Sequence, residues 1–183
     1  VFQVGTDPVA AGLVASLVRP GGNVTGVTNL NTELGPKRLE LLRELIPTAN
    51  TIALLVNPTS PFVTENISRE LQSAARTLGL QLHILNASTE RDFDKVFETL
   101  LQLRADALVI APDAMFISRS EQLGALTLRH AVPAITQFRE FTVAGGRGFL
   151  VHRHDVRHRE AEQAVVGDQY LLQHSCEVVA FRA

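Results

Sequence analysis

Residues 51–85 are TIALLVNPTSPFVTENISRELQSAARTLGLQLHIL, the stretch that decides the fold. The apolar run at residues 51–56 has the length of a buried strand, and a loop with two prolines follows it. Residues 62–78 then predict a helix whose apolar stripe is Ile67, Leu71, Ala74, Ala75 and Leu78. Gly79 ends this helix, and residues 80–85 predict the next strand. The stretch therefore predicts one strand–helix–strand unit.

The same alternation continues on both sides of this unit. We expect further strands at residues 1–4, 23–29, 106–111 and 132–135, and further helices from Pro8 to about Arg19 and over residues 36–46 and 118–130. Another helix is expected after Thr89 and Asp92, which have the spacing of a capping box. Strands that are apolar throughout and separated by helices predict an α/β fold, a doubly wound parallel sheet with helices on both faces.

The composition excludes several classes of protein. The chain is 45% hydrophobic and 20% charged, as in an ordinary globular protein, and its net charge of −2 gives no reason to expect a nucleic acid as partner. No apolar run approaches the ~20 residues that a membrane-spanning helix needs, so we expect no direct membrane insertion by this chain. The single cysteine, Cys176, excludes a disulfide within the chain.

Polar loops follow the predicted strands, and in open α/β sheets the ligand lies beyond the carboxyl ends of the strands. These loops are rich in small hydroxyl and amide side chains and include two aromatic rings. That mixture suits a small polar molecule with an apolar part. The predicted ligand-binding residues are Thr6, Asp7, Thr28, Asn29, Asn57, Thr59, Ser60, Asp113, Phe116 and Phe138.

The loop from Asn57 to Pro61 is the most informative of these. Ser60 is the expected N-cap and Pro61 the first helical residue, which leaves backbone N–H groups that attract a carboxylate or phosphate. The alternative is that Ser60 only caps the helix. Asp7, which precedes Pro8, has the same two interpretations. For Phe116 and Phe138 the alternative to ligand contact is core packing.

The run RPGGNVTGVT at residues 19–28 is the most specific motif in the chain. It is accompanied by GTDPV at residues 5–9, PKRLELLREL at 36–45, VNP at 56–58, and FREF with AGG at 138–146. Together these motifs resemble the ABC transporter substrate-binding proteins associated with tryptophan and tyrosine uptake, over roughly residues 1–146. The resemblance favours Asp7, Thr28, Asn57, Ser60, Asp113 and Phe138 as residues of the ligand cleft.

The resemblance implies a type I periplasmic-binding fold, in which two α/β lobes close by a hinge around a small solute. We expect residues 1–33 to be a fragment of the first lobe with a hinge-side crossover, 34–140 the second lobe, and 141–183 a return crossover with an atypical tail. The implied partners are a solute, such as an aromatic amino acid, and ABC permease subunits, without a cofactor. The implied location is periplasmic, or extracellular and membrane-anchored. With most of one lobe missing, this chain is expected to bind weakly or not at all.

Two features depart from the family pattern. Val1 lies within a strand-like run and is not an initiator methionine, so we expect the native start to lie upstream. We also expect the residues after Gly146 to depart from the family pattern. Our hypothesis is that a frameshift or premature end has replaced the native C-terminus, which sequencing of the locus tests.

Other functions stay open at this stage. His152, His154 and His158 permit a metal site, but a solvated, arginine-rich tail explains them as well, and we expect no metal. An enzyme is not expected, because no nucleophile elbow, P-loop or dinucleotide-binding glycine motif follows a strand. The effector-binding domain of a transcription regulator shares the fold, and an upstream DNA-binding headpiece would favour it. A signal peptide would favour the transporter.

Overall fold

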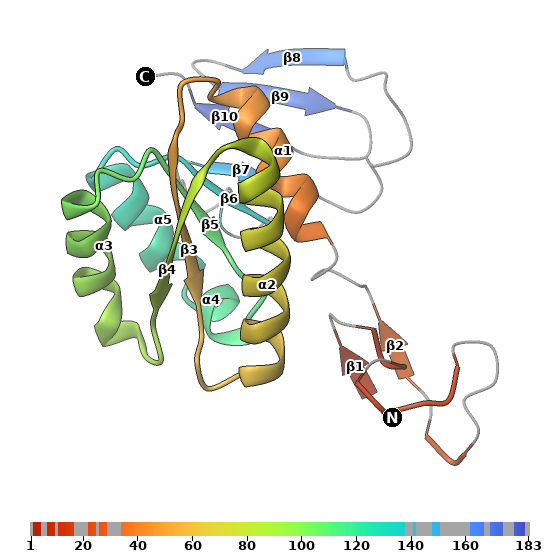
Figure 1. The fold of residues 1–183 in the computed structure, drawn as a ribbon. Helices are drawn as coiled ribbons and strands as arrows, with labels where there is room; N and C mark the ends of the chain where they lie inside the picture. The colour runs from red at the N-terminus through yellow and green to blue at the C-terminus, as the bar shows by residue number, and fades with distance from the viewer. Residues whose placement is uncertain are drawn as a thin grey trace.

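A five-stranded parallel sheet forms the centre of the fold (Figure 1). The computed structural model describes residues 2–4, 7–9, 11–16, 22–24, 26–28, 34–137, 141, 148–150, 162–166, 169–173 and 178–181. The strand order is β4-β3-β5-β6-β7, and each neighbouring pair is parallel. The strands are β3 (Thr51–Val56), β4 (Gln81–Asn86), β5 (Ala107–Ile110), β6 (Ala134–Thr136) and β7 (Gly148–Leu150).

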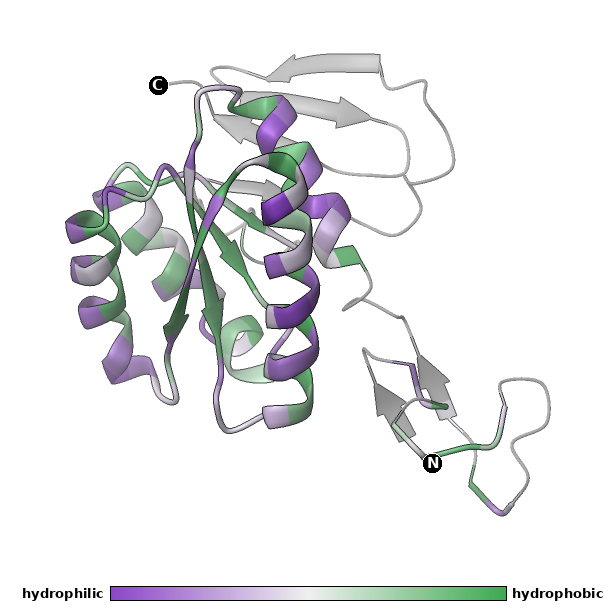
Figure 2. Ribbon diagram, in the orientation of Figure 1, coloured by the Kyte–Doolittle hydropathy of each residue, from purple (hydrophilic) through white to green (hydrophobic). Residues whose placement is uncertain are grey.

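Helices cover both faces of this sheet, which confirms the predicted doubly wound α/β fold. Side chains of α1 (Gly35–Leu45) and α2 (Pro61–Leu78) pack in one apolar cluster. Side chains of α3 (Phe93–Gln102), α4 (Ala114–Ser118) and α5 (Ser120–Arg129) pack in a second. Figure 2 shows the helices with apolar residues toward the sheet and polar residues on their outer sides.

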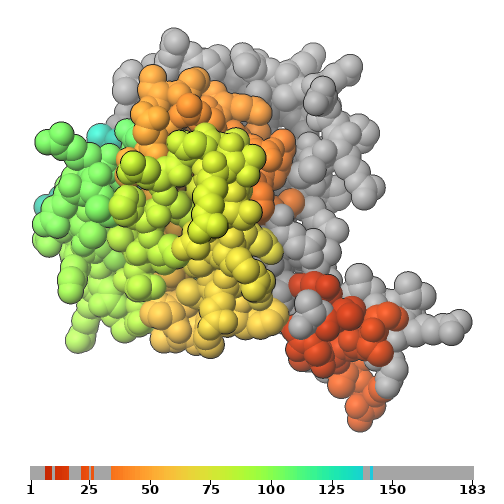
Figure 3. All heavy atoms as spheres, viewed as in Figure 1, coloured from red at the N-terminus to blue at the C-terminus, as the bar shows by residue number. Residues whose placement is uncertain are grey.

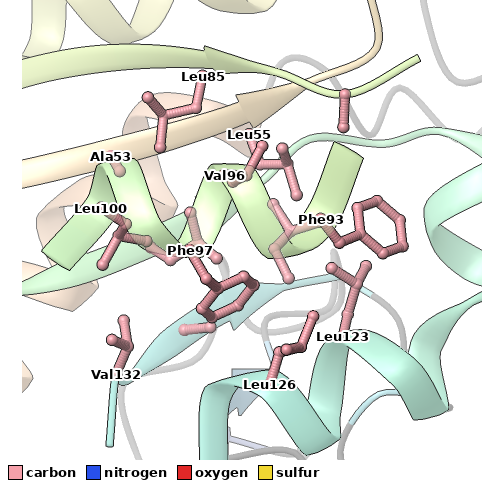
Figure 4. Close-up of a cluster of buried hydrophobic side chains, with 14 of the residues drawn as sticks. Ala53, Leu55, Leu85, Phe93, Val96, Phe97, Leu100, Leu123, Leu126 and Val132 are labelled. Atoms are coloured by element: carbon pink, nitrogen blue, oxygen red, sulfur yellow. The ribbon is translucent and has the colours of Figure 1, made fainter. Parts of the chain in front are cut away.

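The alternation of side chains along each strand divides the core into these two clusters. In β3, Ile52, Leu54 and Val56 belong to the α1–α2 cluster, whereas Ala53 and Leu55 belong to the other. In the second cluster, α3 contributes Phe93 and Phe97 and α5 contributes Leu123 and Leu126, as Figure 4 shows. Burial of each such side chain stabilises the fold by about 1.5–3 kcal/mol, so this packing holds the strand ends in place.

The first turn of α1 lies very close to α2. A Cβ atom added to Gly35 would lie 2.3 Å from Leu71 Cδ1, a distance that only the absence of a side chain allows. The space-filling view shows the side chains of α1 (orange) and α2 (yellow to yellow-green) in contact on the near face (Figure 3). Arg38, one turn further along α1, is completely buried, and this burial lowers the pKa of its guanidinium to about 10.

Local signals explain where several helices begin and end. Pro61 is the first residue of α2, and Gly79 ends that helix with φ of 68°, a left-handed conformation that glycine adopts without cost. The predicted capping box of Thr89 and Asp92 is confirmed, and it opens the short 3₁₀ helix η2 (Glu90–Asp92) that leads into α3. In the part of the chain that the structure describes, no helix combines the length and apolarity needed to cross a bilayer.

The remaining strands form two smaller sheets. β1 (Phe2–Val4) pairs in parallel with β2 (Gly26–Thr28). β2 is shorter than the strand expected at residues 23–29. Three strands in the tail were not predicted: β8 (Glu162–Val166), β9 (Gln169–Gln173) and β10 (Val178–Phe181) form an antiparallel sheet. β7 extends the main sheet beyond residue 140, where we expected the second lobe to end, and the division into lobes stays a prediction.

One expected helix differs from the structure, and one short helix was not predicted. The helix predicted to begin at Pro8 is wrong for residues 8–9 and 11–16, which form turns and bends, and Gly12 has φ of 69°, which an α-helix does not contain. The helix predicted over residues 118–130 is confirmed as α5. The short helix α4 precedes it, and the chain enters α4 directly from Asp113.

Candidate functional site

The loops that follow β3 and β5 are joined through Asp113. Asn57 Nδ2 donates a hydrogen bond of 3.1 Å to Asp113 Oδ1, and Ser60 Oγ donates one of 3.1 Å to Asp113 Oδ2. The two strands are neighbours in the sheet, so both loops leave it at the same carboxyl edge. The structure therefore brings together Asn57, Thr59, Ser60 and Asp113, four of the predicted ligand-binding residues, and we call these four the strand-end cluster.

Asn57 fixes the shape of the first loop. Its side chain is only 7% exposed, and its Oδ1 accepts hydrogen bonds from Thr59 N (3.0 Å) and Thr59 Oγ1 (2.7 Å). Its backbone carbonyl accepts from Ser60 N at 3.1 Å and from Thr64 Oγ1 at 2.6 Å. Because Oδ1 is held by Thr59, the Nδ2 group is directed to Asp113.

Asp113 is the only charged member of the strand-end cluster. It is the N-cap of α4, and its Oδ1 accepts a further hydrogen bond of 2.9 Å from Met115 N. Three donors among the described residues thus bind a carboxylate that can accept about four hydrogen bonds. Oδ2 accepts only from Ser60 within the described part of the chain, so it can accept another donor. A cationic donor such as an ammonium group suits this position best, because the bond is then charge-assisted.

Ser60 occupies the predicted N-cap position of α2, with Pro61 at the first helical position. Its side chain makes no capping hydrogen bond to the helix, and its hydroxyl is directed to Asp113. Ser60 therefore holds the N-cap position without a side-chain cap, and its contact with a ligand stays a prediction. The first-turn N–H groups of α2 are left without that cap at the same edge of the sheet as Asp113.

The other predicted residues are not part of the strand-end cluster. Asp7 Oδ1 accepts from Val9 N at 2.8 Å and opens a turn. Phe116 is 1% exposed and its ring lies 6.1 Å from that of Phe93, so it belongs to the core, as the alternative interpretation held. Thr28 lies in β2, and its backbone is paired with Val4. Thr6, Asn29 and Phe138 lie outside the described residues, as do His152, His154 and His158.

Two polar residues near this edge were missed. Thr64 Oγ1 donates a hydrogen bond to the Asn57 carbonyl. Thr64 precedes Ile67 by three residues, and this spacing indicates that both lie on the buried side of α2. Gln137 follows β6 and is 7% exposed. Its place after an apolar strand predicted a loop at the sheet edge, but nothing in the sequence marked its side chain as buried.

A shallow groove elsewhere on the surface contains none of the predicted residues. Its volume is about 640 Å³, and residues of η2, α3, α4 and α5 line it. Two of the lining residues, Glu90 and Arg119, form an ion pair with each other. Within the described ranges, no group of three or more His, Cys, Asp or Glu side chains could hold a metal. The strand-end cluster is therefore the candidate site.

Comparison with known proteins agrees with this picture. Residues 1–154 match the family described as ABC transporter substrate binding protein. The chain belongs to this family. Its members are binding proteins and not enzymes, which confirms the expectation that the chain is not an enzyme.

One sequence relative and two solved structures are similar to this chain. A tyrosine-binding protein of Clostridioides difficile (strain R20291) is 30% identical over 142 residues, 77% of this chain and 39% of that protein. A conserved domain protein of Vibrio cholerae has a TM-score of 0.66 at 25% identity, covering 79% of this chain and 48% of that one. An ABC domain from Streptococcus pneumonia in complex with L-Trp has a TM-score of 0.65 at 24% identity, covering 82% and 50%. The chain thus spans half or less of the length of these relatives.

Proposed function

We propose that this chain is part of the solute-binding component of an ABC import system, and that its solute is an aromatic amino acid. The family assignment supports binding rather than catalysis. The proposal for the solute draws on a relative that is a tyrosine-binding protein and on a structural neighbour solved with L-Trp. The observation that carries it is the hydrogen-bond arrangement of Asp113, which suits an amino group.

In this proposal Asp113 accepts a hydrogen bond from the ammonium group of the solute. Asn57 and Ser60 hold the Asp113 carboxylate in place with bonds of 3.1 Å each, so it does not need to reorganise when the solute arrives. The solute's carboxylate lies toward the first turn of α2, where the helix dipole and the N–H groups favour negative charge. One small edge of the sheet therefore offers a partner for each charge of a free amino acid.

Transport follows from the two-lobed design that the family resemblance implies. The solute bridges the strand-end cluster and the facing lobe. It stabilises the closed form because only in that form does it contact both lobes at once. An ABC permease then receives the solute from the closed form. This role places the whole protein in the periplasm, or outside the cell and anchored to the membrane.

Titration of L-tryptophan into the ¹⁵N-labelled chain, followed by NMR, tests the proposal. The sequence allows weak binding or none, and the proposal requires weak binding, seen as saturable shifts at millimolar ligand. Asp113→Asn removes the negative charge and should weaken binding at least tenfold, a loss of about 1.4 kcal/mol or more. Asp94→Asn, at an exposed aspartate of α3, is the matched control and should bind as the wild type does. Equal affinity of Asp113→Asn and wild type, with both folded, would contradict the proposal, as would no binding at all.

A further inference from the structure

Gln137 holds a buried oxygen that lacks a hydrogen-bond partner. Its side chain is 7% exposed, and its Oε1 is buried with no partner among the residues that the structure describes. Asn57 is equally buried, yet its side-chain oxygen and nitrogen are both bonded. Buried polar atoms are nearly always paired, because an unpaired one loses its bond to water without replacement. The oxygen of Gln137 is therefore open to a partner outside the described residues, such as a bound ligand.

The strand register places Gln137 at the same edge as the strand-end cluster. Val109 of β5 pairs with Ile135 of β6, so Gln137 lies level with Ala111, and Asp113 follows two residues further along. On the other side of β5, Leu55 pairs with Ile110, which places Asn57 level with Pro112. With strands about 4.8 Å apart, Gln137 and Asn57 flank β5 at roughly 10 Å. A single amino acid can reach from one side to the other.

Gln137 and Asp113 lie in different surroundings, so each suits a different hydrogen-bond donor of the ligand. Asp113 is half-buried and charged, and suits the ammonium group. Gln137 is more deeply buried. Ala111 lies level with it in register and Ile135 precedes it by two residues in β6, and both are apolar residues of the core. A neutral acceptor in apolar surroundings suits a neutral donor on a flat apolar group, since burial of a second charge there would be costly.

We propose that Gln137 Oε1 accepts a hydrogen bond from the side chain of the bound amino acid, the N–H of an indole or the O–H of a phenol. This inference rests on the proposed function of the strand-end cluster. Gln137 is then a specificity residue: it favours tryptophan and tyrosine over phenylalanine, which has no side-chain donor. A site built to bind such a donor discriminates against an analogue without it, because its own polar atom is then left unpaired.

The first test needs no ligand. Gln137→Met keeps the size of the side chain and removes the unpaired oxygen, so the melting temperature of the ligand-free chain should rise. Gln72→Met, at an exposed position of α2, is the matched control and should leave the melting temperature nearly unchanged. A fall in the melting temperature of Gln137→Met would show that the amide is bonded in the free chain and would overturn the inference.

The second test compares ligands by NMR titration of the same variants. The wild type should bind L-tryptophan roughly tenfold more tightly than 1-methyl-L-tryptophan, which lacks the N–H, and than L-phenylalanine. In Gln137→Met this preference should disappear, while Gln72→Met keeps it. If the wild type binds all three ligands equally, or the variant keeps the preference, the role of Gln137 is wrong and the proposed function stands. If the wild type binds none of them, the proposed function fails and this inference fails with it.

Discussion

Ser60 Oγ donates a hydrogen bond of 3.1 Å to Asp113 Oδ2, which lies 53 residues further along the chain. A serine at the start of a helix usually accepts a bond from the helix itself. Here the hydroxyl joins the loop after β3 to the loop after β5 instead, and Asn57 makes a second bond to the same carboxylate. The two loops therefore form one unit at the edge of the sheet, and Asp113 is its centre.

Replacement of Ser60 by alanine should affect stability and ligand binding together. Ser60→Ala removes one hydrogen bond to Asp113, which should lower the free energy of unfolding by about 1 kcal/mol in urea denaturation. It should also weaken L-tryptophan binding several-fold, because the Asp113 carboxylate is less well oriented. Ser73→Ala, at an exposed position of α2, serves as control. Unchanged stability and affinity in Ser60→Ala would show that the bond to Asp113 contributes nothing.

Gly35 should not tolerate a side chain. In Gly35→Ala the new Cβ would lie 2.3 Å from Leu71 Cδ1, and Leu71 is fully buried, so α1 and α2 must move apart. The expected loss is about 1–3 kcal/mol in the free energy of unfolding, although alanine is the better helix former. Leu71→Val in the Gly35→Ala background removes the clashing atom and should recover part of the loss. A stabilised Gly35→Ala chain would contradict this packing.

The capping box of η2 should make stability depend on pH. The backbone N–H groups of Thr89 and Ser88 hold the pKa of Asp92 below its ordinary value. The folded chain therefore favours the ionised carboxylate, and this contribution is full above pH about 4 and is lost as the pH falls further. Asp92→Asn should be less stable than the wild type at pH 7, and the difference should shrink toward pH 3. A difference that stays constant over this range would contradict the assignment.

Asp106 should stabilise the opposite edge of the sheet. Its Oδ2 accepts hydrogen bonds from Asn50 N at 2.8 Å and Thr51 N at 2.9 Å, which join the start of β3 to the start of β5. Asp106→Ala should lower the free energy of unfolding by about 1–3 kcal/mol. Asp106→Asn keeps an acceptor oxygen and should lose less. Ligand binding per folded molecule should be unchanged in both, because these bonds lie far from Asp113 along the strands.

The sequence predicted the sheet and its edge because local patterns determine them. Apolar runs of strand length and the stripe from Ile67 to Leu78 predicted β3, α2 and β4, and Pro61 marked the start of α2. The same patterns placed Asn57, Ser60 and Asp113 at one edge. They could not show which atoms bond there, because the bond partners are separated by more than fifty residues and depend on the pairing of β3 with β5.

The failures also have physical causes. Asp7 and Pro8 are a strong signal for a helix start, but the left-handed conformation of Gly12 ends any helix there. α4 has only five residues, too few for a periodic pattern. The burial of Gln137 depends on the pairing of β6 with β5 and on helices far away in the sequence. Burial of a polar residue is decided by tertiary packing, and a polar residue in a loop gives no local sign of it.

A crystal structure of the chain with L-tryptophan bound tests the central claim most directly. We predict that the ammonium nitrogen lies about 2.8 Å from Asp113 Oδ2, with Asn57 and Ser60 still bonded to the carboxylate. A ligand bound elsewhere on the chain, or one whose ammonium group makes no contact with Asp113, would contradict the claim.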